Sequence, residues 1–372
     1  MNIYKANDIT YRIATKNDES ALKKLLSKNA MDSWVNITLR KEPNYFDADD
    51  LMGESITVIA HKTEDRLEVI GMYSCTLFKL FFEGKDESVI YLNSLRVDPD
   101  FRHKVRFLKE GFISIDKLVS FKATLPFMFT SIASENLNAK RMLESNLKGM
   151  PRYISLAQMS TFSFLAKKYK KARLSLRADH SDIASIVKFY NKVARNHDFA
   201  PILDESWLKT LNGSKGLKIE DFYLVKNREG EIEAIFALWD QRKIKQVVIE
   251  SYRPSINNFR TLYNFYAKMS GNLILPKEGE ALQQVFISFF TTLSKDPEWI
   301  LRILKEASSA CIEEKGAKLC TIGFASHDTL CSLMRDSLKT KEYKTDIEAV
   351  FLSDLTESKI NISHLKPEIA LL

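Results

Sequence analysis

Residues 91–112 read YLNSLRVDPDFRHKVRFLKEGF, and this segment combines the parts of an anion-binding site. An apolar strand, residues 91–97, runs into Asp98 and Pro99, and a basic turn and a helix follow it. The first backbone N–H groups of a helix lack internal partners, and the helix dipole favours negative charge there. We therefore expect a phosphate-bearing ligand at this turn, near the side chains of Arg102, His103, Lys104 and Arg106.

An internal repeat extends the pattern to the whole chain. Ala14 and Asp18 in YRIATKNDESALKKLL correspond to Ala178 and Asp182 in LSLRADHSDIASIVKFY at an offset of 164 residues. Two further segments, residues 59–67 and 69–73, match their counterparts at the same offset. Each copy is expected to begin with a short strand and with an Asp that caps an amphipathic helix.

The rest of each copy predicts two strands joined by a polar turn, then a strand, a helix, a strand and a helix. This order favours an α/β (α+β) fold with a mixed, mostly antiparallel sheet flanked by helices. We expect two tandem domains, residues 1–165 and residues 172–372. The KKYKK run at 167–171 is the predicted link, and we interpret its lysines as a solvated face.

Val97, Pro99 and Arg102 resemble the acyl-CoA signature of the GNAT (GCN5-related N-acetyltransferase) superfamily. That signature is a strand ending in Val-x-Pro, followed by Arg/Gln-x-x-Gly-x-Gly/Ala at the helix start. Val105 and Phe107 stand where the family usually has small residues, which let the backbone approach the pyrophosphate. The resemblance implies backbone N–H donors to the thioester oxygen at Leu95, Arg96 and Val97, with coenzyme A contacts from residues 102–107.

A second family element, Asn-x-x-Ala after the fifth strand, is matched by Asn136 and Ala139. The family usually places a tyrosine four residues later as general acid to the leaving thiolate, and Leu143 stands there. The closing strand of the family pattern follows at residues 149–158. The resemblance covers about residues 10–160 and implies one copy that holds the acyl-CoA site.

The second copy departs further from the family pattern. Its central strand, residues 282–292, leads into Asp296 and Pro297, an acidic helix start without glycines that is a poor phosphate cradle. Residues 252–280 are an insertion relative to the first copy. Its aromatic-rich helix is interpreted as a core or interdomain contact, with a substrate wall as the alternative: Phe259, Leu262, Tyr263, Phe265 and Tyr266.

The resemblance implies an N-acyltransferase that moves an acetyl group from acetyl-CoA to a primary amine of a small molecule or peptide by direct attack. Tyr91 and Asn93 are the candidate general base or water-positioning residues, with ordinary strand roles as the alternative. A second hypothesis is a catalytically inactive GNAT-like module that binds acyl-CoA or another ligand. A third, aminoacyl-tRNA-dependent transfer, lacks a concentrated basic patch.

Composition limits the remaining classes of protein. The 372 residues carry a formal charge of +7 spread along the chain, which fits a small phosphate-bearing ligand better than nucleic acid. No apolar run is long enough to span a membrane, and no secretory signal is recognised. Four cysteines without CxxC spacing favour reduced thiols in the cytoplasm, and scattered histidines predict no metal site. Two copies in one chain mildly favour a monomer over a homodimer.

Overall fold

The computed structural model describes residues 2–29, 35–102, 104–118, 122–145, 147–171, 173–270, 272, 274–352, 360, 362 and 364–372. We call β1 to β8, with the helices between them, the first half. Its strands and α-helices are β1 (Asn2–Ala6), β2 (Ile9–Ile13), α1 (Glu19–Ser27), β3 (Val35–Arg40), β4 (Glu54–Lys62), β5 (Val69–Phe82), β6 (Lys85–Val97), α2 (Val105–Asp116), β7 (Met128–Ala133), α3 (Leu137–Leu143) and β8 (Arg152–Leu165).

The second half begins at β9 and contains the longest helices of the described chain. Its elements are β9 (Ser175–Arg177), α4 (Ile183–Ala194), α5 (Glu205–Thr210), β10 (Phe222–Lys226), β11 (Ile232–Trp239), β12 (Gln246–Tyr252), α6 (Pro254–Ser270), β13 (Gln284–Thr292), α7 (Pro297–Lys315), β14 (Leu319–Ala325), α8 (Thr329–Ser337) and β15 (Thr340–Phe351).

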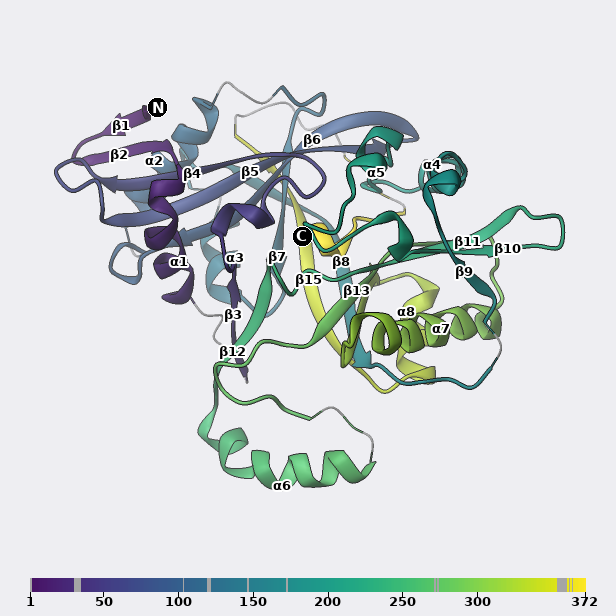
Figure 1. The fold of residues 1–372 in the computed structure, drawn as a ribbon. Coiled ribbons are helices and arrows are strands. Elements are labelled where there is room, and N and C mark those ends of the chain that lie inside the picture. The colour runs from purple at the N-terminus through teal and green to yellow at the C-terminus, as the bar shows by residue number, and fades with distance from the viewer. Residues whose placement is uncertain are drawn as a thin grey trace.

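A single sheet of 13 strands runs through both halves in the order β1-β2-β4-β5-β6-β7-β15-β8-β14-β13-β11-β10-β9. Its pairs are antiparallel except β6 with β7 and β13 with β14, which are parallel. Helices flank the sheet, and a small second sheet pairs β3 with β12 (Figure 1). The predicted fold class, a mixed and mostly antiparallel sheet flanked by helices, is confirmed.

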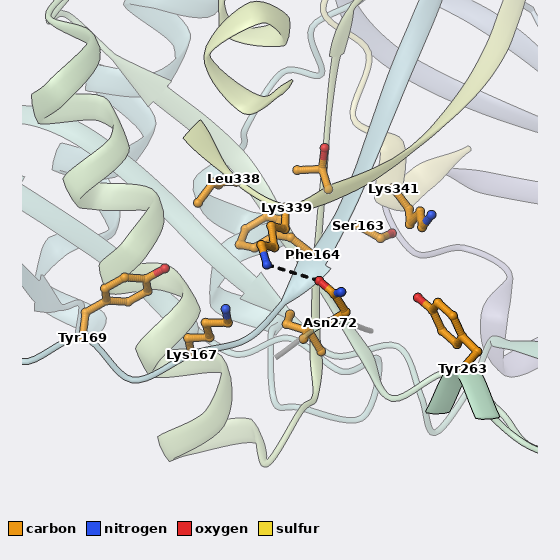
Figure 2. Close-up of a pocket in the computed structure, with 11 residues that line it drawn as sticks. Ser163, Phe164, Lys167, Tyr169, Tyr263, Asn272, Leu338, Lys339 and Lys341 are labelled. Carbon is orange, nitrogen blue, oxygen red and sulfur yellow. Dashed lines mark hydrogen bonds between the residues drawn. The ribbon is translucent and has the colours of Figure 1, made fainter. Parts of the chain in front are cut away.

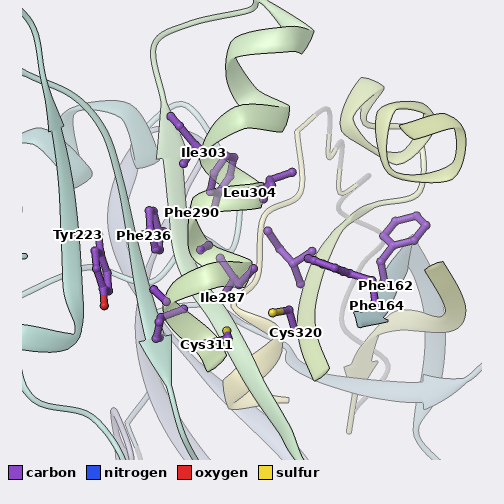
Figure 3. Close-up of a cluster of buried hydrophobic side chains, with 14 of the residues drawn as sticks. Phe162, Phe164, Tyr223, Phe236, Ile287, Phe290, Ile303, Leu304, Cys311 and Cys320 are labelled. Carbon is purple, nitrogen blue, oxygen red and sulfur yellow. The ribbon is translucent and has the colours of Figure 1, made fainter. Parts of the chain in front are cut away.

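The closing strand of each half crosses into the other half. β15 lies between β7 and β8, while β8 lies between β15 and β14. Phe162 and Phe164 of β8 are therefore buried in the core of the second half, in one cluster with Ile303 and Leu304 of α7 (Figure 3). Ile347 of β15 is buried in turn beside β5, β6 and β7. The two halves thus share one interlocked sheet, and the division at residues 165 and 172 stays a prediction.

The repeat found in the sequence folds alike at both helix starts. The Asp18 carboxylate accepts the Thr15 N–H at 2.8 Å, and the Asp182 carboxylate accepts the Asp179 N–H at 3.1 Å. Asp18 also pairs with Arg12 at 2.6 Å, and this guanidinium lowers the pKa of the carboxyl to about 2. Each Asp is therefore the acidic partner of a capping box at the turn before the helix, with Thr15 or Asp179 as the N-cap, and it does not itself cap an N–H of the helix.

Two expectations about the chain ends and the insertion are incomplete or wrong. β1, in the polar N-terminal segment, was not predicted, and it pairs with β2 as an edge strand. Phe259, Phe265 and Tyr266 of α6 are exposed and do not form the predicted core or interdomain contact, whereas Tyr263 is half-buried and lines a cavity with residues of β8 and β15. The cause is the position of α6, which stands off the body of the protein (Figure 1).

Two further sequence expectations concern the cysteines and the membrane-spanning segments. Cys75, Cys311, Cys320 and Cys331 are all buried and free. Among the described residues, no helix combines the length and the apolar character that a membrane span requires.

Candidate active site

A β-bulge interrupts the middle of β6. Asn93 faces Ser74 and Arg96 faces Met72, so Ser94 and Leu95 together oppose Tyr73. Ser94 adopts a positive φ of 54°, which is uncommon for a residue other than glycine. A bulge removes a residue from the hydrogen-bonded ladder and turns its backbone N–H away from the neighbouring strand. The pairing of β6 with β7 also stops here, at Tyr91 and Phe129.

The helix that follows, α2, begins without a side-chain cap. Lys104 occupies the N-cap position and makes no capping hydrogen bond, although its carbonyl accepts the Phe107 N–H at 2.9 Å. No described residue accepts the backbone N–H of Val105 or Arg106. These donors, together with the positive end of the helix dipole, suit a phosphate.

The basic side chains around this turn are exposed and held by local contacts. Arg102 donates to Asn29 Oδ1 at 2.7 Å, and the Lys104 ammonium lies 4.1 Å from the centre of the Phe101 ring. Arg106 donates to Asn7 Oδ1 at 2.9 Å and to Glu110 at 3.1 Å. His103, also predicted to contact phosphate, lies outside the described residues.

The two large residues at the expected small positions take different directions. Phe107 is buried between α2 and the sheet, where a Cβ on Gly71 would come within 2.7 Å of the Phe107 ring. Tyr11 donates from its hydroxyl to the Phe107 carbonyl at 3.1 Å. Val105, by contrast, is exposed. Phe107 therefore fills the core, and its ring does not occupy the space in front of the helix.

The Asn-x-x-Ala segment starts α3. Asn136 Oδ1 accepts the Ala139 N–H at 3.2 Å and so caps the helix. Ala139 packs on the cluster beneath α2, and Leu143 is buried in the same cluster. The position at which the family resemblance implies a proton donor therefore lies in the core.

Tyr91 and Asn93, the predicted catalytic candidates, lie on one face of β6 beside the bulge. The Tyr91 hydroxyl is 2.6 Å from that of Ser131, and its ring stacks on Phe129 at 4.7 Å between centres. Burial raises the pKa of Tyr91 to about 12, so its phenol stays protonated near neutral pH. Asn93 donates to Thr76 Oγ1 at 3.2 Å and accepts from the Ser94 hydroxyl at 2.9 Å.

A polar network that sequence reasoning missed crosses β4, β5 and β6 on this face. Thr57 and Ser74 share a 2.8 Å hydrogen bond, and Thr57 reaches Asp49 at 3.4 Å. Asp49 forms a buried ion pair with Lys41 at 2.7 Å. The available signal was the recurrence of hydroxyl residues at alternate positions of strands that are otherwise apolar, which places them on one face: Ser55, Thr57, Ser74 and Thr76.

Arg96 follows the bulge and carries a charge without a carboxylate partner among the residues that the structure describes. Its guanidinium donates to the Leu95 carbonyl at 2.8 Å, and burial lowers the pKa of this group. Tyr343 of β15 is close enough for the charges of Arg96 and Glu135 to shift the pKa of its phenol, which burial raises to about 12. Because β15 belongs to the second half, the exchanged strand brings Tyr343 to the first-half site.

The second half contains an equivalent bulge that is already occupied. Phe289 of β13 has a φ of 54°, and the register of β13 on β11 shifts at this point. The Phe289 N–H donates to Glu368 Oε2 at 2.7 Å. The helix after this strand, α7, is capped by Asp296, which accepts the Glu298 N–H at 3.0 Å. In the second half, Glu368 thus accepts an N–H at the bulge and Asp296 accepts one at the helix start. Among the described residues of the first half, no side chain accepts the corresponding N–H groups.

Comparison with known proteins gives a likeness in fold alone. No protein-family model matches the chain, and no curated protein matches it significantly in sequence. A structure of Saccharomyces cerevisiae N-myristoyltransferase with bound myristoyl-CoA superposes with a TM-score of 0.60 at 10% identity, covering 95% of this chain and 84% of that protein. A second structure of that enzyme with bound myristoyl-CoA gives a TM-score of 0.59 at 11% identity over 94% of this chain and 80% of its own.

The chain has the tandem GNAT fold. In GNAT terms, β6 and β7 are the parallel pair of the first copy, and β13 and β14 are that of the second. The recognised pattern therefore extends over both halves of the chain, although the sequence motifs were clear in the first half alone.

Proposed function

We propose that the protein is an N-acyltransferase whose first half binds an acyl-CoA and transfers the acyl group to a primary amine of a small molecule or peptide. The observation that carries the proposal is the difference between the two bulges. The N–H of Phe289 is taken by Glu368, whereas no described side chain accepts the N–H of Ser94 or Leu95. An oxyanion requires such an available donor.

In this proposal the turn before α2 holds the phosphates of the donor. The uncapped N–H groups of Val105 and Arg106 and the side chains of Arg102 and Lys104 supply hydrogen bonds and positive charge. The thioester carbonyl then lies at the β6 bulge, where backbone N–H groups at Ser94 to Arg96 stabilise the negative charge that develops on its oxygen. Arg96 adds a positive charge on the same strand.

The reaction is a direct attack. The neutral amine nitrogen forms a bond to the acyl carbon, the C–S bond breaks, and the sulfur leaves as a thiolate that takes up a proton. Leu143 cannot supply that proton. Tyr343 is the candidate donor, because it is 40% exposed and lies near Arg96 and Glu135 at the end of β7.

The space beside the bulge supports a short acyl group, and acetyl-CoA is the donor that we propose. The cavity between α2 and β5 has a volume of about 30 Å³ and is lined by apolar residues that include Tyr73, Leu95 and Phe107. Pockets that bury a whole small ligand measure about 300 Å³ or more. An acyl chain as long as myristoyl would require these side chains to move.

The alternative, a binding module without catalysis, is favoured by the burial of Leu143 at the expected acid position. One experiment separates the two functions. Thermal unfolding is measured with acetyl-CoA, free CoA and myristoyl-CoA, because a ligand that binds only the folded state raises the melting temperature. Thiol release is then followed with a panel of amines.

A rise with acetyl-CoA together with thiol release that depends on an amine supports the proposed transferase. A rise without turnover on any amine favours the binding module. If none of the three ligands raises the melting temperature, the proposed transferase is excluded, and a module that binds a ligand other than coenzyme A becomes the leading hypothesis.

A further inference from the structure

Helix α6 presents an apolar face to solvent. The helix contacts mainly its own return segment, in which Asn264 and Leu275 exchange hydrogen bonds of 2.9 and 2.8 Å and Arg260 donates to the Pro276 carbonyl at 2.9 Å. The opposite side carries five large side chains that are each more than 60% exposed, and we call them the α6 apolar face: Phe259, Leu262, Phe265, Tyr266 and Met269.

These residues form a stripe and are not scattered. Phe259, Leu262, Tyr266 and Met269 follow a spacing of three and four residues, which places them on one side of a helix. At 17 residues, α6 is about 26 Å long. Contiguous exposed apolar surface on a water-soluble fold marks a site of interaction. The helix stands apart from the body (Figure 1), and the exposure of these five side chains leaves the face accessible to a partner.

The charged residues within α6 are basic, Arg260 and Lys268, while Glu278 and Glu280 lie on the return segment beside β12. Residues 251–277 contain no Asp or Glu and four basic residues. The helix also borders a cavity of about 240 Å³ at the ends of β8 and β15, lined by Lys167, Lys339 and Lys341 together with Tyr263 and Asn272 (Figure 2). Lys339 donates to Asn272 Oδ1 at 3.4 Å. Within the described chain, no carboxylate lies within ion-pair distance of these three lysines.

We propose that α6 and this lysine cavity form a docking surface for a membrane that contains anionic phospholipids. An amphipathic helix with aromatic and aliphatic residues on one face and basic residues beside them lies in the plane of the lipid interface. The α6 apolar face enters the acyl boundary, and the lysines, including those of the KKYKK run at 167–171, contact lipid phosphates. The mode is peripheral and needs no membrane span.

The charge pattern argues against two other occupants. A second copy of the chain would bring Lys167, Lys339 and Lys341 against the same three lysines, and within the described chain no carboxylate pairs with them. Nucleic acid would use the lysines, but the aliphatic Leu262 and Met269 offer nothing to phosphates or base edges. An anionic bilayer uses both the apolar face and the positive charge.

The test is flotation of the purified protein with vesicles of phosphatidylcholine alone or of phosphatidylcholine with phosphatidylglycerol. We expect binding to the anionic vesicles, little binding to the neutral ones, and weakening by salt. The double variant Phe265→Ser/Met269→Ser should lose at least tenfold in partitioning. Its control is Leu67→Ser, which changes a residue that is 86% exposed in the turn after β4.

A second pair of variants tests the charges. Lys339→Ala/Lys341→Ala should weaken binding about fivefold for each lysine removed. Lys188→Ala/Lys192→Ala, two exposed positions on α4, should leave it unchanged. All of these side chains are surface residues, so an unchanged melting temperature is expected and verifies the fold.

Three results would overturn the proposal. One is an absence of binding to anionic vesicles, and another is equal binding to both vesicle types in all variants. The third is that the α6 variant keeps its lipid binding but loses another property of the wild type. That property would be either a dimer seen by light scattering or binding to RNA. A dimer would identify a second copy as the occupant, and RNA binding would identify nucleic acid. None of these readouts depends on the proposed acyl transfer.

Discussion

Ser94 and Phe289 have the same positive φ of 54° at equivalent bulges of β6 and β13. The N–H of Phe289 donates to Glu368 at 2.7 Å, while no side chain in the described chain accepts that of Ser94. The bulge is thus common to both copies of the fold. The two halves differ in whether a side chain accepts the N–H at the bulge. In the second half the acceptor of this N–H is a single glutamate in the C-terminal segment.

Replacing Glu368 should therefore affect stability and not donor binding. Glu368→Ala removes the acceptor of the Phe289 N–H and of the Ala370 N–H, the latter at 3.2 Å. We expect the free energy of unfolding to fall by about 1–3 kcal/mol, the usual cost of a buried donor without a partner. Chemical denaturation measures this change. If acetyl-CoA no longer raises the melting temperature of this variant, the donor site belongs to the second half.

Removing the basic side chains before α2 should weaken binding of the phosphate-bearing donor. Arg102→Ala/Lys104→Ala is expected to lower the affinity for acetyl-CoA about tenfold, a modest figure because both groups are exposed. Calorimetry with N-acetylcysteamine thioester, which has no phosphate, should show no such loss. Lys295→Ala, beside the capped start of α7, is the matched control. Unchanged affinity in the double variant would place the phosphates elsewhere.

The residues at the two expected glycine positions should respond in opposite ways. Phe107→Ala leaves a cavity against Gly71 and should lower the free energy of unfolding by about 3–5 kcal/mol. Val105→Ala changes an exposed position and should alter it by less than about 0.5 kcal/mol. Urea denaturation compares the two variants. A stable Phe107→Ala protein that binds acetyl-CoA more tightly would mean that the ring obstructs the donor site.

Tyr343 is expected to act on the leaving group. Tyr343→Phe should lower kcat about a hundredfold and leave the KM for acetyl-CoA unchanged. An aryl thioester, whose thiolate leaves without a proton, should restore the rate. Tyr266→Phe serves as control, since it removes an exposed hydroxyl on α6 and should leave the rate unchanged. An equal loss of rate with the aryl thioester would assign Tyr343 a structural role.

Glu348 should make stability depend on pH. Burial, and then the nearby Glu144, raises the pKa of this β15 carboxyl to about 7, from an ordinary value of 4.5. Between these values the folded protein holds a proton that the unfolded chain has released. Stability therefore falls as pH rises from about 4.5 to about 7. Glu348→Gln should flatten this part of the profile, as measured by thermal unfolding across that range. A profile identical to that of the wild type would rule out this linkage.

Much of the fold was predictable because its signals are local. Asp18 and Asp182 lie at their helix starts as expected, although each accepts the N–H three residues before it and not an N–H of the helix, and the strand predicted at residues 282–292 is β13, Gln284–Thr292. Turn chemistry and hydrophobic periodicity act over a few residues, so they are visible in a sequence. The basic turn before α2 and the capped turn before α7 were likewise distinguishable by composition.

The sequence did not predict the exchange of β8 and β15, nor Glu368 as the acceptor of the N–H at the β13 bulge. Pairing between β15 and β7 joins residues more than 200 positions apart, as Ser134 and Asp346 illustrate with a 2.8 Å hydrogen bond. No local pattern specifies such a partner, because strands with the same alternation can pair in either half. The contact of Glu368 could not be predicted either, because the N–H that it accepts belongs to Phe289, which is 79 residues away in the sequence.

The exchange of β8 and β15 has a consequence for how the protein can be divided. A fragment cut at the 167–171 link would lose the side chains that the other half places in its core, such as Phe162 or Ile347, and would display an open edge where the other half's last strand had been. Neither piece should remain monomeric alone, whereas the two pieces expressed together should reassemble by complementation. The second half is thus needed for the strand that it donates to the sheet of the first, whatever its own bulge binds.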